Sequence, residues 1–396
     1  MIEKEVLLHQ TDKILPWLVE VRRDFHAHPE FGMEEFRTKD KICDYLDGMG
    51  IPFKAGIANT GVVGLIQGEQ DGKTVALRAD MDALPILEKN DIPYKSTIDG
   101  KMHACGHDAH MTVLLGAAKL LQENKHLLKG NVKLLFQPAE ETVGGAEPMI
   151  KEGALENPKV DAVFGLHVDP AIPLGKIGVK YGQMNASSDT ITITVKGKNA
   201  HGAYAYMGKD AIVIAAQVIG ALQTIVSRGV DARESAVISI GTIHGGTQGN
   251  IVADEVKLVG TVRTLTPEIR KGVLQKLEET VTYVAKGMGG EAVLSVEPGY
   301  SSLINDDGMV DIVKASGEAL IGEENVNLIS RPSLGVEDFA FFAKAVPGAF
   351  FRLGVRNKER GIVHEVHTPY FNIDENSLKI GVAMQVWNVF SFLDGL

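Results

Sequence analysis

The sequence has few of the features that mark secreted, membrane-bound or nucleic-acid-binding proteins. Its only two cysteines, Cys43 and Cys105, cannot build a disulfide framework. The 40 Lys and Arg are outnumbered by 51 Asp and Glu, so a net charge of −11 argues against nucleic acid or an anionic membrane as main partner. We find no apolar run near the ~18 residues of a membrane span, and the charged N-terminus lacks a signal peptide's apolar segment. These absences predict a cytoplasmic protein.

The chain has enough length and apolar content for about two or three domains, with 396 residues of which 44% are hydrophobic. In its first part, short apolar strands alternate with helices of 3.6-residue periodicity. This alternation predicts an α/β domain with a mainly parallel sheet. We expect Asp108 to be the N-cap of one helix. The expected strands are 62–66, 75–78, 132–136 and 160–166, and the expected helices are 5–28, 34–49 and 108–123.

The pattern changes near residue 186, because Thr190–Lys196 alternates strictly between polar and apolar residues. The elements that follow complete a β-α-β-β-α-β, ferredoxin-like order; they are a helix at 209–227, strands at 236–243 and 255–264, a helix from Thr266, and a strand at 291–297. We therefore predict a catalytic domain formed by residues 1–185 and 305–396, with 186–304 inserted as a lid. Exposed strand edges of the lid would suit a homodimer or a higher homo-oligomer.

The side chains that suggest chemistry lie where predicted strands end or helices begin. The stretch Met102–His110 contains one thiol and three imidazoles. Since ligands bind at the carboxyl ends of parallel strands, these segments deliver metal-ligand side chains to one edge of the sheet. Cys, His and carboxylate groups bind zinc-like divalent ions. The candidates are Asp80 and Asp82 after one strand, Cys105 and His107 before a helix, Glu140 and Glu141 after the next strand, and the isolated His167 and His367.

The adjacent pair Glu140–Glu141 suggests a division of labour. One carboxylate would bind metal, and the other would take a proton from metal-bound water. Either Asp80 or Asp82 could orient a ligating imidazole. We therefore expect a metal-activated hydroxide to attack a carbonyl, with a Glu passing the proton to the leaving amine. The alternatives are a thiol hydrolase with Cys105 as nucleophile beside His107, and a non-catalytic binding protein. His26, His103 and His110 receive no role.

Several motifs along nearly the whole chain resemble one family, the dinuclear-metal amidohydrolases that include aminoacylase, hippurate hydrolase, auxin-conjugate hydrolases and N-acetyldiaminopimelate deacetylase. These are relatives of the zinc carboxypeptidases with an inserted lid. The matching segments are Arg22–Glu30, Leu77–Pro85, Met102–Asp108, Gln137–Glu141, Gly165–His167, Glu337–Phe339 and His367–Pro369.

The resemblance implies a metallopeptidase-like fold and specific roles. It makes Glu140 the general base and places Asp80 and Asp82 in the family's acidic strand-end motif. The implied cofactors are two divalent metal ions, of Zn, Mn, Co or Ni, and the implied ligands are Cys105, His107, Glu141, His167 and His367. The expected reaction is hydrolysis of an N-acyl-L-amino acid, carrying an acetyl, benzoyl or related acyl group, to a carboxylate and a free amino acid. The alternatives are a metallo-carboxypeptidase or dipeptidase, and an N-acetyldiaminopimelate deacetylase of lysine biosynthesis.

The inserted segment also carries motifs that resemble this family. Gly197–His201 is similar to the lid motif whose His binds the substrate oxyanion, often across a dimer interface. Asn250 and Arg263 lie in segments similar to the lid's substrate-binding segments, and an Arg can bind a free carboxylate bidentately. Lid closure is expected to bring His201 and Arg263 to the substrate. Many relatives have Pro-His where this chain has Ala205-Tyr206, so the resemblance does not by itself define the side-chain pocket or the substrate.

Overall fold

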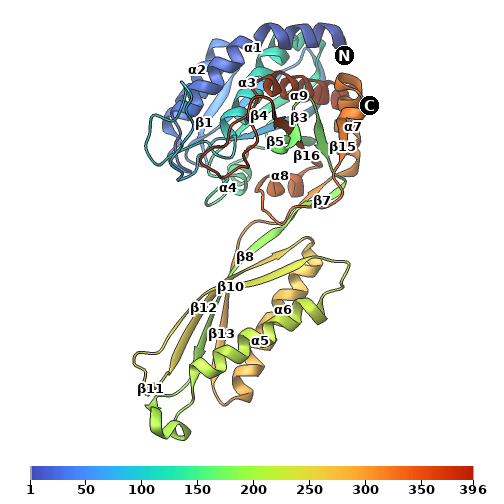
Figure 1. The fold of residues 1–396 in the computed structure, drawn as a ribbon. Helices are drawn as coiled ribbons and strands as arrows, with labels where there is room; N and C mark the ends of the chain where they lie inside the picture. Colours follow the sequence, from blue (N-terminus) through green and yellow to red (C-terminus); the bar gives the residue numbers. More distant parts are fainter. Residues whose placement is uncertain (1, 396) are drawn as a thin grey trace. The chain divides into compact units, whose positions relative to one another are not determined.

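The computed structural model describes residues 2–395 and divides the chain into two compact units (Figure 1). The first unit contains the chain up to Gly182, Ile304–Arg331, and the chain from Phe341 onward. The second contains Gln183–Leu303 together with Pro332–Ala340. The sequence analysis assigned Pro332–Ala340 to the second part of the catalytic domain, so the structure differs there. That segment pairs locally with the start of the second unit, since the amide of Ser333 donates to the carbonyl of Met184 (2.9 Å).

The first unit is built on one mixed eight-stranded sheet. Its central neighbours β4–β3, β3–β5 and β5–β16 are parallel, whereas β1, β2 and β6 pair antiparallel with their neighbours toward the centre of the sheet. The mainly parallel sheet predicted from the sequence is thus confirmed. In spatial order the strands are β1 (Phe53–Ile57), β2 (Gly61–Gln67), β4 (Lys129–Gln137), β3 (Gln70–Asp80), β5 (Ala162–Pro173), β16 (Gly348–Arg356), β6 (Ile177–Val179) and β15 (Val326–Leu328).

The helix α3 (His107–Glu123) is buried along most of its length. Every residue from His107 to Ala118 is buried, as expected for a helix packed on all sides. It contacts α1 (Lys4–Ala27), α9 (Asn376–Asp394) and β3. Gly116 permits this packing, because a Cβ there would lie 2.6 Å from Val382 and 2.7 Å from Leu18. The other helices of this unit are α2 (Phe36–Gly48), α4 (Ala146–Lys151) and α7 (Asp307–Ile321), with short 3₁₀ turns at Lys125–Leu127 and Glu323–Asn325. Helix α8 (Phe339–Ala345) begins at the end of the Pro332–Ala340 segment and continues into the first unit.

The expectation that Asp108 caps α3 is wrong. The helix begins one residue earlier, at His107, after Gly106 in the left-handed region (φ 91°). An N-cap side chain would accept an amide proton of the first turn, but the Asp108 carboxylate instead contacts Arg22 and His26. The start of α3 is therefore stabilised by the buried contacts of Asp108 with Arg22 and His26, and not by an N-cap side chain.

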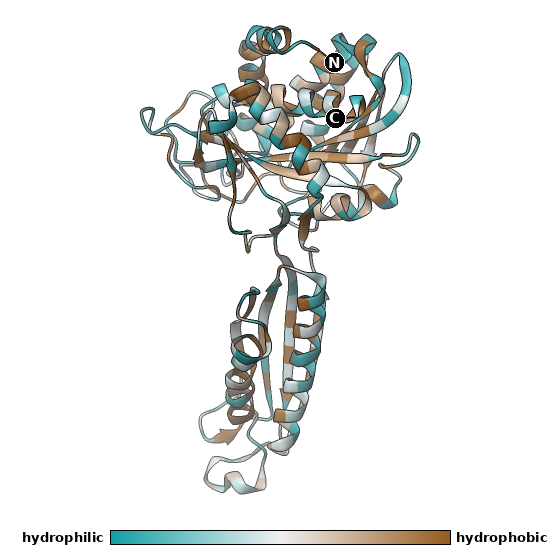
Figure 2. Ribbon diagram, turned by 90° about the vertical axis from the view of Figure 1, so that its right-hand side faces the viewer, coloured by the Kyte–Doolittle hydropathy of each residue, from teal (hydrophilic) through white to brown (hydrophobic). Residues whose placement is uncertain are grey.

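The second unit has the predicted β-α-β-β-α-β order, and its sheet is antiparallel throughout. Helices α5 (Ala211–Gly229) and α6 (Pro267–Gly287) pack together on one face of that sheet. Ile191, Ile193 and Val195 of β8 are buried against them, and the alternation of apolar and polar residues can be followed in Figure 2. The strands are β10 (Ala236–Gly245), β12 (Glu255–Thr264), β8 (Ser187–Lys196) and β13 (Glu291–Pro298), with shorter elements β7 (Gly182–Asn185), β9 (Ala200–His201), η2 (Gly202–Met207), β11 (Ile251–Val252) and β14 (Leu303–Asn305).

Helix α5 corrects another expectation. By length and composition it is apolar enough to cross a membrane, although the sequence analysis found no run of that size. Its buried residues recur at helical spacing and belong to the core of its own unit: Ala211, Ile214, Ala215, Val218, Leu222 and Ile225. A helix that packs on a sheet passes the same test of length and composition, so this packing accounts for the hydropathy of α5. The cytoplasmic location stays a prediction.

Candidate metal centre

The side chains predicted to bind metal come from four stretches of the first unit. Cys105 lies in the loop before α3, and His107 is the first residue of α3. Glu141 lies in the turn after β4, His167 lies in β5, and His367 lies in the loop before α9. Strands β3, β4 and β5 run parallel, so their carboxyl ends meet at one edge of the sheet. The fold therefore delivers residues that are far apart in sequence to the same place.

These side chains converge in two overlapping groups, and Cys105 belongs to both. One group is Cys105, His107 and His167, and the other is Cys105, Glu141 and His367; within each, the possible ligand atoms lie within 4.8 Å of one another. The Cys105 Sγ is 3.2 Å from Nε2 of His167 and 3.3 Å from Nε2 of His367. The structure thus brings together every residue that was predicted to bind metal, with the sulfur shared between the groups.

Two of the converging atoms are buried and have no hydrogen-bond partner within residues 2–395. They are Nε2 of His107 and Oε1 of Glu141. Nε2 of His367 lies 3.0 Å from this Oε1, an ion-pair contact when the imidazole is protonated. Unsatisfied buried polar atoms destabilise a fold, and a cation bound at each of these atoms would satisfy it. A set of sulfur, imidazole nitrogen and carboxylate oxygen fits zinc-class divalent ions.

The protonation states of these groups follow from burial and from neighbouring charges. Burial raises the pKa of the Cys105 thiol well above its usual range, and the charges of Glu141 and Glu140 add to this. Burial lowers the pKa of His167, helped by the charge of His110, so His167 is neutral. Burial opposes protonation of His107 too, but Asp80 and Asp82 outweigh it and raise the pKa of His107 to about 10. A divalent cation would reverse this balance by displacing protons from the thiol and the imidazole.

Asp82 is the carboxylate that orients a predicted metal ligand, which the sequence analysis left open between Asp80 and Asp82. Nδ1 of His107 lies 3.2 Å from Oδ1 of Asp82, so a proton on Nδ1 leaves Nε2 free to bind metal. The same carboxylate accepts the backbone amides of Glu140 (3.1 Å) and Glu141 (2.9 Å). One buried side chain therefore fixes an imidazole ligand together with the turn that carries both glutamates.

Asp80 contacts His110, which in turn contacts the backbone next to the predicted ligand His167. Oδ1 of Asp80 is 2.6 Å from Nδ1 of His110, whose Nε2 accepts the backbone amide of Val168 (2.9 Å), next to His167. Asp80 also lies near His107 and His110 in a cluster that could itself hold an ion, but Arg78 donates to it at 2.8 Å, and that charge disfavours a cation there. The sequence analysis missed His110, although its position one turn after His107 on the same helix face signals it.

The geometry of this site can be set beside known proteins. Residues 76–386 match peptidase family M20/M25/M40. The chain belongs to this family. N-acetyl-L-cysteine deacetylase of Bacillus subtilis is 40% identical over 362 residues, covering 91% of this chain and 84% of its own. Thermostable carboxypeptidase 1 of Saccharolobus solfataricus is 37% identical over 381 residues, covering 95% of each.

One solved structure is also similar to this chain. It is that of a Bacillus subtilis protein described as a dinuclear metal binding peptidase from the M20 family. The two chains superpose with a TM-score of 0.86 at 34% identity, over 97% of this chain and 100% of the other. Together with the M20 match, these similarities confirm the resemblance and the fold class predicted from the sequence. This M20-family chain is a metal-dependent amidohydrolase.

Two backbone conformations at the candidate centre are uncommon for residues that have a Cβ. His367 has φ 61° and Ala139, directly before Glu140, has φ 57°, both in the left-handed region. The amide of His367 donates to the carbonyl of Ala104 (2.8 Å), which ties its loop to that of Cys105. Such conformations persist only where surrounding contacts enforce them, and they concentrate at functional sites.

A buried network of charged side chains contacts α3, the helix of this amidohydrolase that begins with His107. Nε of Arg22 donates to Oδ2 of Asp108 (2.7 Å), and Nδ1 of His26 lies 2.8 Å from the same oxygen. Nε2 of His26 is in turn 3.2 Å from Glu88. Arg22, His26 and Asp108 are fully buried. His26, given no role from sequence, thus joins the RRDFHAHPE motif to the start of α3.

Replacing Asp108 with Asn is expected to lower the free energy of unfolding by about 3–5 kcal/mol at neutral pH, because Arg22 stays buried without its carboxylate. Burial alone would raise the pKa of Asp108, but Arg22 and His26 outweigh burial and hold this pKa well below its usual range. A lowered carboxyl pKa stabilises the fold above the unfolded pKa of about 4, and this stabilisation is lost as the pH falls through the folded pKa.

The difference in unfolding free energy between wild type and the variant should therefore shrink below about pH 4. Urea titrations in chelator, repeated at several pH values, measure this difference. A difference that is independent of pH, or one under ~1 kcal/mol, would show that the network contributes little.

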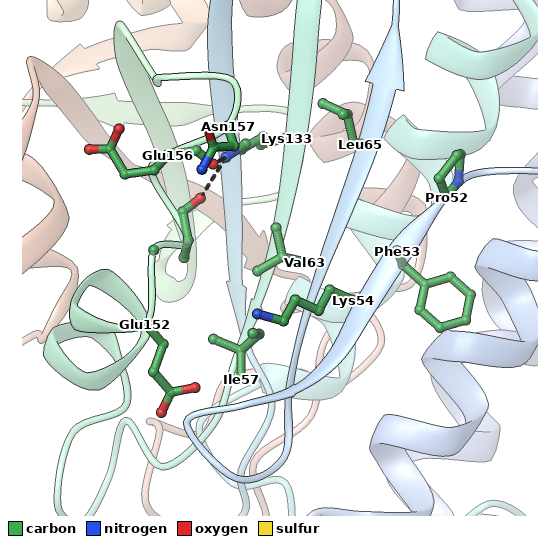
Figure 3. A pocket seen from close by; sticks show the side chains of 12 residues that line it. Pro52, Phe53, Lys54, Ile57, Val63, Leu65, Lys133, Glu152, Glu156 and Asn157 are labelled. Carbon is green, nitrogen blue, oxygen red and sulfur yellow. Dashed lines mark hydrogen bonds between the residues drawn. The ribbon is translucent and has the colours of Figure 1, made fainter.

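A separate hollow of about 330 Å³ lies elsewhere in the first unit (Figure 3). It is lined by β1, β2, Lys133 of β4 and the turn after α4, and none of the predicted ligands faces it. The buried Lys133 ammonium donates to the backbone carbonyls of Ala154 (3.1 Å) and Glu156. Lys133 thus holds the turn after α4 in place.

In the second unit, His201 and Asn250 lie close together, but Arg263 does not. His201 pairs with Ile251, and the amide of Gly202 donates to the carbonyl of Asn250 (2.7 Å). Both lie beyond the Glu255 end of β12, whereas Arg263 lies near the opposite end of that strand. Eight residues of strand separate Arg263 from Glu255, or roughly 26 Å. The expectation that both side chains reach one substrate is therefore not met within one copy of this unit.

Proposed function

We propose that this protein hydrolyses the amide bond of N-acyl-L-amino acids at a centre that binds two divalent metal ions. The observation that carries the proposal is the pair of three-residue ligand groups that share Cys105. His107 and His167 would complete the site of one cation, and Glu141 and His367 that of the other. Bound there, the cations supply Lewis acidity toward the substrate carbonyl and the attacking water.

Glu140 has the properties of the base in this reaction. It is 7% exposed, and it follows β4 directly before a predicted ligand. Its backbone is fixed by Asp82, which holds the amides of both glutamates. Glu140 takes a proton from the attacking water as the carbon–oxygen bond forms. It then gives that proton to the amide nitrogen as the carbon–nitrogen bond breaks, so that the products are a carboxylate and a free amine.

The rival thiol mechanism finds little support in this geometry. A nucleophilic cysteine needs a lowered pKa and a nearby cation or base. Burial and two carboxylates instead raise the pKa of Cys105, and its sulfur lies 3.2 Å and 3.3 Å from the imidazoles of two predicted ligands, His167 and His367. Cys105 is better suited to bind metal than to attack a carbonyl.

The substrate class rests on the deacetylase relative, whose name specifies an N-acetyl amino acid. The carboxypeptidase relative favours a second candidate, the release of a C-terminal amino acid from a peptide. Both reactions leave a free carboxylate next to the new amine, and so both would use the same centre.

A substrate panel separates these candidates. The enzyme is stripped with chelator, reloaded with Mn²⁺, Zn²⁺, Co²⁺ or Ni²⁺, and assayed on acetyl-, benzoyl- and peptidyl-amino acids. We expect no turnover without metal, and kcat/KM at least ~10-fold higher for N-acyl amino acids than for peptides. A preference for peptides would favour the carboxypeptidase, and undiminished activity in chelator would contradict a metal centre altogether.

We also propose that the protein acts as a homodimer in which His201 serves the centre of the partner subunit. An N-acyl amino acid spans only about two residues, roughly 7 Å, far less than the separation of His201 and Arg263 along one unit. If both contact the substrate, they come from different copies of the chain.

Mixing two inactive variants tests the shared site. Glu140→Gln lacks the base but keeps His201, and His201→Ala keeps the base. Random dimers of the two should recover about a quarter of wild-type activity, because half of the dimers are mixed and each of these has one complete site. Recovery should follow subunit exchange measured by native mass spectrometry. Exchange without recovery would show that His201 acts within its own chain or not at all.

A further inference from the structure

The buried carboxylate of Glu35 lies next to the turn that carries the proposed base, although nothing above gives it a role. Glu35 precedes α2 and is fully buried. Its Oε1 accepts the backbone amide of Ala139 (2.8 Å), and its Oε2 accepts the hydroxyl of Thr60 (2.6 Å). Glu35 therefore joins the loop after α1 to the residue that precedes Glu140.

Three successive amides of this turn are held by carboxylates from other parts of the chain. Glu35 accepts the amide of Ala139, and Asp82 accepts the amides of Glu140 and Glu141. Each amide has one carboxylate oxygen as acceptor, so the direction of the chain is fixed at every residue from 139 to 141. Ala139 is the residue with φ 57°, and a left-handed residue with a Cβ needs such contacts to hold it.

The loop that carries Glu35 is itself pressed against the same turn. A Cβ added to Gly32 would lie 2.4 Å from Oγ1 of Thr142 and 2.9 Å from Cα of Ala139. On its other side, Phe31 pairs with Ala83, and the amide of Ala83 donates to the carbonyl of Glu30 (2.9 Å). The loop thus lies between the segment after Asp82 and the turn before Glu140, and it can set the distance between them.

Stability alone does not account for a carboxylate at this position. Among the described residues, no Lys, Arg or His forms an ion pair with Glu35; its hydrogen-bond donors are the hydroxyl of Thr60 and the backbone amides of Ala139 and of Glu35 itself. Burial raises the pKa of Glu35 to about 7, with a further contribution from the charge of Asp82. A buried carboxylate without an ion pair costs free energy even when it is hydrogen-bonded, whereas the contacts of Glu35 fix the turn at Ala139.

We propose that Glu35 is a positioning residue for the hydrolysis, which aims Glu140 by holding the left-handed turn at Ala139. This inference rests on the proposed function, in which Glu140 is the base. Glu35 contacts neither the ligand groups nor the substrate through any contact described above. It should therefore affect kcat with little effect on KM or bound metal.

Three variants distinguish a positioning role of Glu35 from an effect of its charge and from an effect on the stability of the fold. Glu35→Gln keeps the length and an oxygen that can accept the Ala139 amide. Glu35→Asp keeps the charge but is one methylene too short to reach it. Thr60→Val is the matched control, because it removes the other partner of the same carboxylate and leaves the Ala139 contact in place. Each is measured by steady-state kinetics, metal stoichiometry and thermal unfolding.

The Asp variant should lose ~10–100-fold in kcat, since small misplacements of a catalytic group have effects of this size, with KM and metal content as in wild type. The Gln variant and Thr60→Val should keep kcat close to wild type. Wild-type kcat in Glu35→Asp would overturn the inference, as would equal losses in Glu35→Gln or in Thr60→Val. Glu140→Gln is assayed in parallel: if it stays active, the proposed function fails, whereas an inactive Glu140→Gln beside a fully active Glu35→Asp removes this inference alone.

Discussion

Replacing Glu140 with Gln is expected to lower kcat by about 10²–10⁴-fold, the usual contribution of a general base. The amide is nearly the same size as the carboxylate but cannot accept the proton of the attacking water. The backbone contacts of Glu140 with Asp82 do not involve its side chain, so the turn should stay in place. Bound metal, measured by elemental analysis after gel filtration, should remain as in wild type.

Glu141→Gln is the matched control, because the same substitution one residue later changes a predicted ligand in place of the base. Glu141 belongs to the ligand group with Cys105 and His367, so this variant should lose metal together with activity. The two variants are thus expected to differ: Glu140→Gln loses turnover but keeps metal, whereas Glu141→Gln loses both. If Glu140→Gln also lost metal, or if it retained kcat, the assignment of base and ligand would be wrong.

Replacing Cys105 with Ala is expected to remove both metal ions at once. Cys105 is the residue common to the two ligand groups, so its loss leaves each group with two side chains. Removing even a supporting residue around a metal typically lowers affinity by ~10–100-fold, and loss of a shared ligand should exceed this. Metal content should fall well below one ion per chain, and turnover should fall with it.

Cys43→Ala provides the control for general effects of removing a thiol. Cys43 is the only other cysteine, it is partly buried on α2, and it belongs to none of the candidate ligand groups. This variant should bind metal and turn over substrate as wild type does. A Cys105→Ala protein that kept one tightly bound ion would indicate that the sulfur serves a single cation and does not bridge two.

Most of the ligand set could be predicted because its members lie next to elements with a clear pattern. Cys105 and His107 lie at the start of α3 and Glu141 follows β4, whose periodicity is clear in the sequence. His167 lies within β5 (Ala162–Pro173), which continues past the expected strand end at residue 166. His367 lies before α9 in a loop without such a signal, and its assignment came from resemblance. The family, the parallel sheet and the βαββαβ order of the inserted unit were predictable for the same reasons of pattern and motif.

Contacts between distant segments could not be predicted. Asp80 and Asp82 are two residues apart on the same strand end, and only the fold shows that Asp82 reaches His107 whereas Asp80 reaches His110. The partners of Asp108 lie on α1, 86 and 82 residues away. Glu35 contacts Ala139 across 104 residues. No local periodicity contains such information.

The shared role of His201 and Arg263 stays a prediction, and their separation within one chain could not be predicted. Motif similarity assigns residues to one function without stating how far apart they lie in one chain. Strand register supplies that distance, because β12 runs almost its full length between them. The same limit applied to α5, whose hydropathy by itself does not distinguish a membrane span from a helix packed on a sheet.

The most direct test is a crystal structure of the zinc-loaded enzyme with anomalous scattering recorded at the zinc edge. We predict two anomalous peaks, each about 2.3 Å from the Cys105 sulfur, one also bound by His107 and His167 and the other by Glu141 and His367. A single peak that does not touch Cys105, or zinc bound away from these side chains, would contradict the account.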